Sequence, residues 1–478
     1  MELDNSQLLF IENFKTNLRI FNNDFLILSG PAGTGKTEVI KESAKICEKL
    51  GIGYQCLAFT GRAASVLRSR GLTNARTIDS WFWYLKRREV MGDLKKLDKF
   101  VIFIDESSMI SNSAIIYSDK EPELDFKLDE IMWSTYRHIP CKSIMFVFVG
   151  DENQLPPIKH DYAPALDIDY FKNRYGLNGA SFQLNKPHRQ KKESEISEIA
   201  ENFKNKNNSE NLKIPPLSQI KGDIKLLKNS EVIPTFFDLY FRNKHSVKII
   251  TATNKKADFY NFSIKEKLSP GSSELYEKYH IPTDYLEPQK GDILQIFENT
   301  RRVYEYPLYN GQFVEILELG PVREHVLSKG NRNFDRIPFI NQDILVDTVS
   351  DSGEKSGNLL NITISIDHLV NNSNLNKVQY EFFDKKDTGM LDSIKDYEYI
   401  SGNKRVYSQQ IYNPTLARFG YAITGHKAQG GGWENIIIDF SGFNDDKGHL
   451  PPSWIYTAIT RAKSNLYVVN YPTEDLNE

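Results

Sequence analysis

Short apolar runs that stop abruptly at polar residues recur along the chain. They are FLILSG ending at Gly30, YQCLAFT at Thr60, FVIFIDE at Glu106, SIMFVFVGD at Asp151, SVKIITATN at Asn254 and NIIIDFS at Ser441. Runs that are apolar on both faces are typical of parallel strands buried between helices. They predict an α/β fold with parallel sheets. The polar residues that end these runs could be ordinary turns after core strands. However, ligands of open α/β sheets bind beyond the carboxyl ends of the strands, where these polar residues lie.

Two changes in composition indicate the domain organisation. Residues 202–223 are rich in Asn, Lys and Pro, which is typical of a surface linker. Residues 300–410 replace the buried-strand pattern with alternating stretches such as GQFVEILEL and NITISIDHL, which predict a small β-rich insertion. The apolar runs return from Tyr421 onward, so we expect a second α/β domain that the insertion interrupts.

Composition excludes several classes of protein. Among 478 residues, 60 Lys and Arg oppose 63 Asp and Glu, which excludes a strongly basic nucleic-acid coat but allows a basic groove. The three cysteines lack zinc-type spacing, so we expect reduced thiols. No apolar run approaches the roughly 18 residues of a membrane span, and the acidic start MELDNSQ does not have the pattern of a signal peptide. The expected location is the cytoplasm of a bacterial cell or a phage-infected host.

A phosphate-binding loop follows the first apolar run. Residues 30–37 read GPAGTGKT, which matches G-x-x-x-x-G-K-[ST] between a predicted strand and a predicted helix. In such loops backbone N–H groups face phosphate oxygens, the lysine reaches the β- and γ-phosphates, and the hydroxyl ligates Mg²⁺. The predicted nucleotide-binding residues are Gly30, Pro31, Ala32, Gly33, Thr34, Gly35, Lys36 and Thr37.

Two further strand ends carry catalytic chemistry. Asp105 in FIDESSM can hold Mg²⁺ through water, and Glu106 can orient and deprotonate an attacking water. This adjacent acidic pair favours nucleotide hydrolysis over phosphate transfer to a small substrate. In GDENQLPPI, Gln154 can hydrogen-bond a γ-phosphate or its water, and Asp151 can relay that contact.

These three motifs, in this order, resemble the superfamily 1 helicases, and most of all the Dda-like, RecD-like and Pif-family enzymes. The resemblance implies ATP and Mg²⁺ as cofactors. It assigns Gln7 to adenine reading, Gln429 in AITGHKAQGGGWENIIID to the nucleotide, and Arg189 in LNKPHRQ and Arg461 in WIYTAITRAK to two arginine fingers.

The resemblance also implies contacts with a nucleic-acid strand. The positions that match the strand-contacting motifs of the family are Thr60, Thr77, Thr253, Asn254, Thr424 and His426. The sequence departs from the family pattern twice. Asp79 replaces a usual histidine in RTIDSW, and Gly432 replaces a glutamate found in many relatives.

The resemblance implies two RecA-like P-loop domains. We expect the first at residues 1–180, the second at 181–300 and 411–478, and the β-rich accessory insertion at 301–410. Residues 81–99 (WFWYLKRREVMGDLKKLDK) match the position of a fork-splitting wedge in related helicases, although core packing of Trp81, Phe82 and Trp83 is the alternative. The basic residues of this segment either contact phosphates or are solvated.

The predicted function is that of an ATP-dependent helicase that moves along single-stranded DNA, 5′ to 3′ by resemblance, and unwinds duplex. The expected partners are single-stranded and forked DNA, with replication proteins or a single-strand-binding protein as candidates, and the expected state is a monomer. Three alternatives stay open at this stage: a translocase that strips proteins from DNA, a nucleotide-dependent switch without processive motion, and an RNA track.

Overall fold

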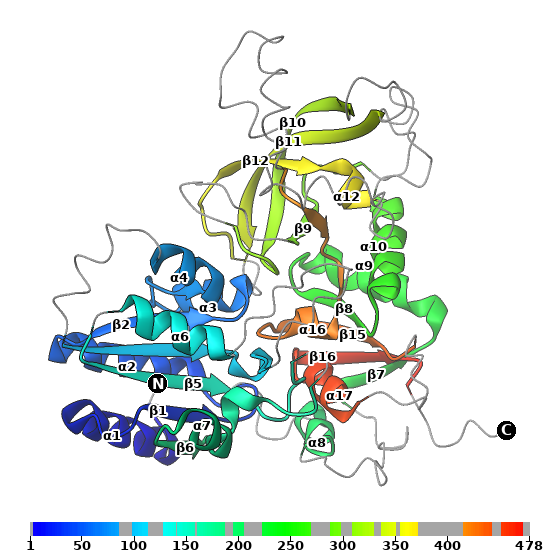
Figure 1. Cartoon of the computed structure of the whole chain (residues 1–478). Helices are drawn as coiled ribbons and strands as arrows, with labels where there is room; N and C mark the ends of the chain where they lie inside the picture. The colour runs from blue at the N-terminus through cyan, green and yellow to red at the C-terminus, as the bar shows by residue number, and fades with distance from the viewer. Residues whose placement is uncertain are drawn as a thin grey trace. The chain divides into compact units, whose positions relative to one another are not determined.

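A computed structural model describes most of the chain (Figure 1). The described residues are 3–85, 98–112, 128–139, 141–157, 160–186, 195–204, 222–268, 287–297, 308–328, 336–349, 354–370, 414–441 and 451–471. They divide into two compact units, the first made of Met1–Asn229 with Gly425–Glu478 and the second of Ser230–Thr424.

A six-stranded parallel sheet is the centre of the first unit. Its strand order is β3-β2-β4-β5-β1-β6. The strands are β1 (Phe25–Ser29), β2 (Gly53–Ala58), β3 (Arg76–Thr77), β4 (Lys99–Asp105), β5 (Ser143–Gly150) and β6 (Gly179–Gln183). The register pairs Ala58 with Asp105 and Ser29 with Gly150, so the strand ends that carry the predicted chemistry lie along one edge.

Helices cover both faces of this sheet, as Figure 1 shows. On one face lie α1 (Asn5–Ile20), α2 (Lys36–Leu50) and α3 (Gly61–Ser69). On the other lie α4 (Ile78–Leu85), α6 (Leu128–His138) and α7 (Ile168–Tyr175), with the 3₁₀ turn η2 (Pro164–Leu166). Another 3₁₀ turn, η1 (Ser107–Met109), follows β4.

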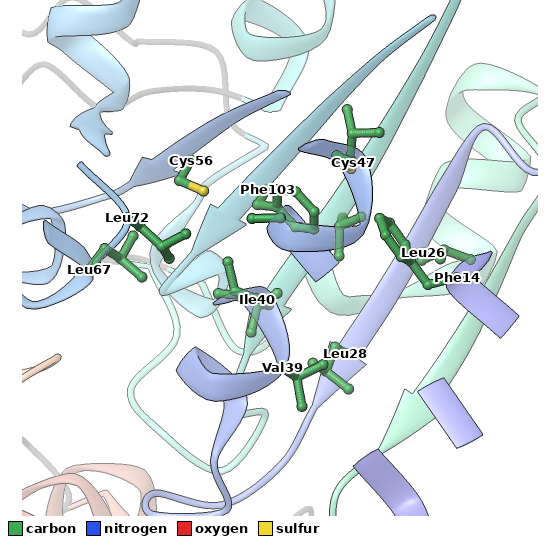
Figure 2. Packing of buried hydrophobic residues seen from close by; sticks show 14 of the residues in the cluster. Phe14, Leu26, Leu28, Val39, Ile40, Cys47, Cys56, Leu67, Leu72 and Phe103 are labelled. Atoms are coloured by element: carbon green, nitrogen blue, oxygen red, sulfur yellow. The ribbon is translucent and has the colours of Figure 1, made fainter. Parts of the chain in front are cut away.

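The alternation of side chains along each strand explains why these runs are apolar throughout. Leu26 and Leu28 pack with Phe14 and Val39 in the α1/α2 core (Figure 2), whereas their neighbours Phe25 and Ile27 belong to the core under α6 and α7. Each strand therefore supplies two cores at once, as expected for a sheet covered on both faces.

The remaining elements of the first unit come from both parts of the chain. They include a second parallel set of strands in the order β15-β16-β7, formed by β15 (Trp433–Asp439), β16 (Ala462–Val469) and β7 (Ile224–Leu227). The helices α8 (Glu195–Glu201), α16 (Gly425–Ala428) and α17 (Pro452–Ile459) accompany them.

The second unit combines a parallel strand pair with an antiparallel sheet. The parallel pair is β8 (Val247–Thr251) with β14 (Ala422–Thr424), beside α9 (Val232–Arg242) and α10 (Asn254–Leu268). The antiparallel sheet has the order β12-β11-β10-β9-β13. Its strands are β9 (Ile293–Ile296), β10 (Phe313–Ser328), β11 (Arg336–Val349), β12 (Leu360–Ser365) and β13 (Ala417–Phe419), with α12 (Ile366–Val370) following β12.

The six predicted strands are all present, and the predicted α/β class with parallel sheets and a β-rich sheet is confirmed. Within the segment 81–99, Trp81 is buried and stacks on Tyr84 and Phe100, and Phe82 packs against the same core. The core-packing alternative is therefore right for these two rings. Residues 86–97 of the wedge prediction and 205–221 of the linker prediction lie outside the described residues.

The three cysteines have free thiols, as expected: Cys47 and Cys56 are buried and Cys141 is partly buried. None of the described helices is long and apolar enough to span a bilayer.

A buried carboxylate fastens the antiparallel sheet to the end of α9. Glu315 on β10 forms ion pairs with Lys244 and with His245, the latter at 3.2 Å, and with Lys355 at 3.2 Å. Burial alone would raise the pKa of Glu315, but hydrogen bonds from His245, Lys244 and Lys355 together lower it to about 2. The charged form of Glu315 therefore stabilises this fold.

We expect Glu315→Gln to lower the free energy of unfolding by about 2–3 kcal/mol near neutral pH, because Lys244 and Lys355 lose a buried counter-ion and His245 loses a charged partner. A carboxyl with a depressed pKa stabilises the fold above its ordinary value, and that contribution disappears as pH falls from about 4.5 toward 2. Urea unfolding at several pH values measures the difference, which should shrink over this window. The exposed Glu318→Gln on the same strand should change stability by less than about 0.5 kcal/mol. A pH-independent difference for Glu315→Gln would contradict the assignment.

Candidate nucleotide-binding site

The loop between β1 and α2 has the backbone geometry of a phosphate cradle. Gly33 and Gly35 have φ of 83° and 82°, a region that disfavours side chains. A Cβ on Gly30 would lie 2.7 Å from the carbonyl oxygen of Leu184, so this position has no room for one. Because α2 begins at Lys36 without a side-chain cap, its N-terminal N–H groups face the loop, where an anion is favoured.

Two side chains hold this loop in shape. Lys36 Nζ donates to the carbonyl oxygens of Gly30 at 2.6 Å and Pro31 at 3.0 Å. The buried Gln7 donates from Nε2 to the Thr34 carbonyl at 2.9 Å, and its Oε1 accepts from the Asp4 N–H in the capping box of α1. Gln7 thus contacts the loop directly, while its adenine-reading role stays a prediction.

The acidic pair lies at the end of β4, beside Lys36. Burial raises the pKa of Asp105 to about 7, and Glu106 acts in the same direction, while Lys36 and the Glu106 N–H oppose it. Glu106 has φ of 55°, which is uncommon for a residue other than glycine and is often found at functional sites. Because the backbone turns at Glu106, the two consecutive carboxylates point in different directions. Asp105 is buried and Glu106 is partly exposed.

The donor set suits a hard divalent cation. A buried carboxylate with a raised pKa gains from a nearby cation, and Mg²⁺ prefers oxygen ligands with phosphate and water completing its shell. The part of the chain that the structure describes has no cluster of three or more His, Cys, Asp or Glu suited to a metal. Asp105 and the Thr37 hydroxyl would therefore hold Mg²⁺ only together with phosphate oxygens.

The loop after β5 is hydrogen-bonded to α17. Asp151 Oδ2 accepts from Gln154 Nε2 at 3.2 Å and from the Tyr456 hydroxyl at 3.0 Å. Thr457 Oγ1 accepts from the Leu155 N–H at 3.0 Å, and Gln429 Nε2 donates to the Leu155 carbonyl at 3.0 Å. Gln154 and Gln429, both predicted site residues, thus both hydrogen-bond to residues of the loop after β5.

Tyr456 has a role that sequence reasoning missed. Its buried hydroxyl donates to Asp151 Oδ2. Burial raises its pKa well above the ordinary value, Asp151 acts in the same direction, and a hydrogen bond from the Ala32 backbone opposes both. Tyr456 therefore links α17 to the phosphate loop. Its position five residues before Arg461 was the only signal in the sequence.

Arg461 is buried at the end of α17 with each guanidinium nitrogen engaged. Nε donates to the Thr457 carbonyl at 2.9 Å, Nη1 to the Gly431 carbonyl at 3.1 Å and Nη2 to Thr460 Oγ1 at 3.0 Å. Burial lowers its pKa, and the carboxylates of Glu106 and Asp151 oppose that effect. Arg461 thus lies within electrostatic reach of Glu106 and Asp151. Arg189, the other predicted finger, lies outside the described residues.

The predicted strand-contacting residues divide between the two units. In the first unit, Thr60 caps α3 by accepting from the Ala63 N–H, and Thr77 is buried and accepts from the Ser80 N–H. His426 lies in α16, and burial lowers its pKa, which favours the neutral ring.

In the second unit, the Thr253 hydroxyl accepts from the Lys256 N–H at the start of α10. Asn254, the first residue of this helix, has its Oδ1 at 3.5 Å from Nη1 of Arg418. Thr424 ends β14 and is buried. Thr60, Thr253 and Asn254 are thus at helix starts, where exposed N–H groups suit phosphate, whereas Thr77 and Thr424 are enclosed.

Comparison with known proteins gives two family matches. Residues 16–118 match the AAA domain family, and residues 419–469 match the UvrD-like helicase C-terminal domain. The chain is 22% identical to the RecD subunit of the RecBCD enzyme of Buchnera aphidicola, over 94% of this chain and 71% of that protein.

Two relatives are uncharacterised proteins. One, from Methanocaldococcus jannaschii, is 25% identical over 95% of this chain, which spans only 37% of that protein's length. The other, from Acanthamoeba polyphaga mimivirus, is 24% identical over 78% of this chain and 75% of its own.

Solved structures of Pif1 helicases share the fold. A Pif1 helicase from Bacteroides, in complex with ADP-AlF3 and ssDNA, aligns over 99% of this chain and 94% of its own with a TM-score of 0.51 and 17% identity. A structure of two coordinating Pif1 helicases at forked dsDNA aligns over 99% of this chain and 93% of its own, again with a TM-score of 0.51 and 17% identity.

The chain thus resembles superfamily 1 helicases of the Pif1 and RecD type in its sequence and shares the fold of the Pif1 structures. The expected resemblance and the expected two-RecA-domain fold class are thereby confirmed. The helicase motifs of the first unit meet along one sheet edge, from the phosphate loop to the acidic pair and the loop after β5.

We expect Lys36→Ala to abolish nucleoside triphosphate turnover, because the loop loses the cation that faces the β- and γ-phosphates. Binding of a fluorescent ATP analogue should weaken by about tenfold to a hundredfold, the worth of a hydrogen bond to a charged group. Phosphate release and fluorescence titration measure the two effects. Lys45→Ala on the same helix, which removes a surface pair with Glu42, should behave as wild type. Full turnover by pure Lys36→Ala protein would show that the loop is not the site.

Proposed function

We propose that the protein is an ATP-dependent DNA helicase that moves along single-stranded DNA and unwinds duplex. The observation that carries this proposal is the buried Arg461, which lies within electrostatic reach of Glu106 beside the phosphate loop. A nucleotide-binding loop alone serves many functions, whereas an acidic pair opposed by such an arginine suits hydrolysis.

Residues of this chain would divide the work of hydrolysis. The loop N–H groups and Lys36 would bind the β- and γ-phosphates, and Gln154 would orient the attacking water. Glu106 would accept the proton of that water. Mg²⁺, when bound through Thr37 and Asp105, would neutralise charge on the phosphates.

Arg461 would act on the developing charge of the γ-phosphate. Its three present acceptors are neutral carbonyl and hydroxyl oxygens. A phosphate oxygen carries a negative charge that these acceptors lack and can be bound by two parallel N–H groups, so a nucleotide would compete for this guanidinium. Arginine fingers of this kind can contribute about 10³–10⁵ in rate. Arg189 would supply a second finger by resemblance alone.

The proposed division of labour follows the expected domains. Residues 1–180 would form the first RecA-like domain, residues 181–300 and 411–478 the second, and residues 301–410 an accessory β-rich insertion. Thr60, Thr77, Thr253, Asn254, Thr424 and His426 would contact the strand. Alternate tightening of these contacts during the ATP cycle would produce directed movement.

DNA as the track is supported by the Pif1 structures with ssDNA and forked dsDNA named above. The 5′-to-3′ direction is proposed from the RecD-like and Pif1-like resemblance. Contacts through backbone phosphates and stacked bases carry little sequence preference, so we expect unwinding of unrelated duplexes at similar rates.

The function is tested by unwinding of duplexes that carry either a 5′ or a 3′ single-stranded tail, made in DNA and in RNA. We expect ATP-dependent unwinding of the 5′-tailed DNA only. Unwinding of the 3′-tailed DNA would show that the protein moves from 3′ to 5′. Preferential unwinding of the RNA substrates would show that RNA is the track. Displacement of a bound protein block without unwinding would replace the helicase by a stripping translocase.

We expect Glu106→Gln to bind ATP and single-stranded DNA as wild type does and to hydrolyse ATP about 10²–10⁴-fold more slowly, because it removes only the general base. Steady-state phosphate release, ATP binding and DNA binding by fluorescence anisotropy measure the three properties. Glu152→Gln, an exposed carboxyl in the loop after β5, is the matched control and should retain activity. Simultaneous loss of ATP and DNA binding by Glu106→Gln would mean that the residue is structural.

A further inference from the structure

Arg62 is a buried arginine to which neither the sequence motifs nor the comparisons assign a role. It lies on α3, two residues after the helix-capping Thr60, and is 4% exposed. Its guanidinium carbon lies 3.9 Å from the centroid of the Trp433 ring. A desolvated arginine over an indole face is a favourable contact of about 2 kcal/mol, yet burying a charge is costly. Such a placement is unusual for a residue that only fills space.

Gly431 lies directly against this guanidinium. A Cβ at Gly431 would lie 2.2 Å from Cζ and Nη2 of Arg62. The φ of Gly431 is not in the left-handed region, unlike that of Gly430 at 74°, so a side chain would fit there only if the Arg62 guanidinium moved. Arg62 therefore sets how closely the turn at 430–431 approaches α3.

The same turn holds Arg461 and borders Glu106. The Gly431 carbonyl accepts from Arg461 Nη1 at 3.1 Å. A Cβ on Gly430 would lie 3.4 Å from Glu106 Oε1 and 3.5 Å from the Ala63 Cβ of α3. The positive charge of Arg62 also acts on Arg461. One short turn thus lies against α3, Glu106 and the proposed arginine finger.

We propose that Arg62 is a positioning residue that links strand binding at the start of α3 to the placement of Arg461. The proposal rests on the proposed function, in which Thr60 contacts the strand. A helix moves as a rigid element, so a shift of α3 carries Arg62 against Trp433 and Gly431. The Gly431 carbonyl then moves relative to Arg461. Strand binding would in this way regulate hydrolysis without a contact between DNA and nucleotide.

The test measures ATP hydrolysis with and without oligothymidylate single strands. Arg62→Met keeps the length and apolar contact of the side chain but removes the charged plane. We expect its rate without DNA to stay within about twofold of wild type and its stimulation by DNA to fall by about tenfold, within the usual range of coupling between sites. Gly431→Ala, which pushes the guanidinium away while Arg62 is intact, should have the same effect. Arg70→Ala, at the exposed C-cap of α3, should be stimulated normally.

A double-mutant cycle decides whether the two residues act together. Because both changes break one contact, the double variant should be no worse than either single variant. Additive losses would overturn the proposal, as would normal stimulation in Arg62→Met. Equal losses with and without DNA, accompanied by a lower melting temperature, would show a structural role instead. Absence of stimulation in wild type would refute the proposed function itself, a separate result from failure of the variants.

Discussion

The buried carboxylate of Asp105 is the constraint on which the site depends. A charge at the end of β4 is costly away from water, which is why the pKa of Asp105 rises to about 7. A second carboxylate at Glu106 adds to the cost, and Lys36 offsets part of it. This arrangement persists only because the rest of the sheet is well packed on both faces. The positive φ of Glu106 and the buried carboxylate of Asp105 are both typical of a site that is stabilised when it binds Mg²⁺ and phosphate.

The parallel sheet turns this local constraint into a complete site. The order β2-β4-β5-β1 brings four strand ends together, although the chain visits them in a different order. The phosphate loop follows β1, Thr60 follows β2, the acidic pair ends β4, and Gln154 follows β5. Two bonds from α17, by Tyr456 and Thr457, then place Arg461 near this edge. Catalytic groups from distant parts of the chain meet because the sheet aligns them.

Local patterns predicted the parts of this arrangement that depend on neighbours in sequence. Apolar runs predict all six strands because their side chains are buried almost throughout, and β1, β2, β4 and β5 each supply two cores. GPAGTGKT predicts the loop because its glycines and lysine have specific backbone and charge roles. The acidic pair Asp105 and Glu106 in DESSM was likewise predicted from its local pattern, two carboxylates at the end of a buried strand. What the patterns could not give are contacts between residues hundreds of positions apart. The Tyr456 hydroxyl bond to Asp151 and the stacking of Arg62 on Trp433 depend on tertiary packing alone. Burial likewise distinguishes the enclosed Thr77 from the helix-capping Thr60, which the motif comparison treated alike.

The most direct test of the account is a crystal structure with ADP, aluminium fluoride and Mg²⁺ bound, since this combination mimics the transferring phosphoryl group. The account predicts that Arg461 leaves the Gly431 carbonyl and donates to the fluoride at about 2.9 Å, with Lys36 donating to the β-phosphate side. A structure in which the analogue occupies the loop while Arg461 keeps its bonds to Thr457, Gly431 and Thr460, out of reach of the fluoride, would contradict it.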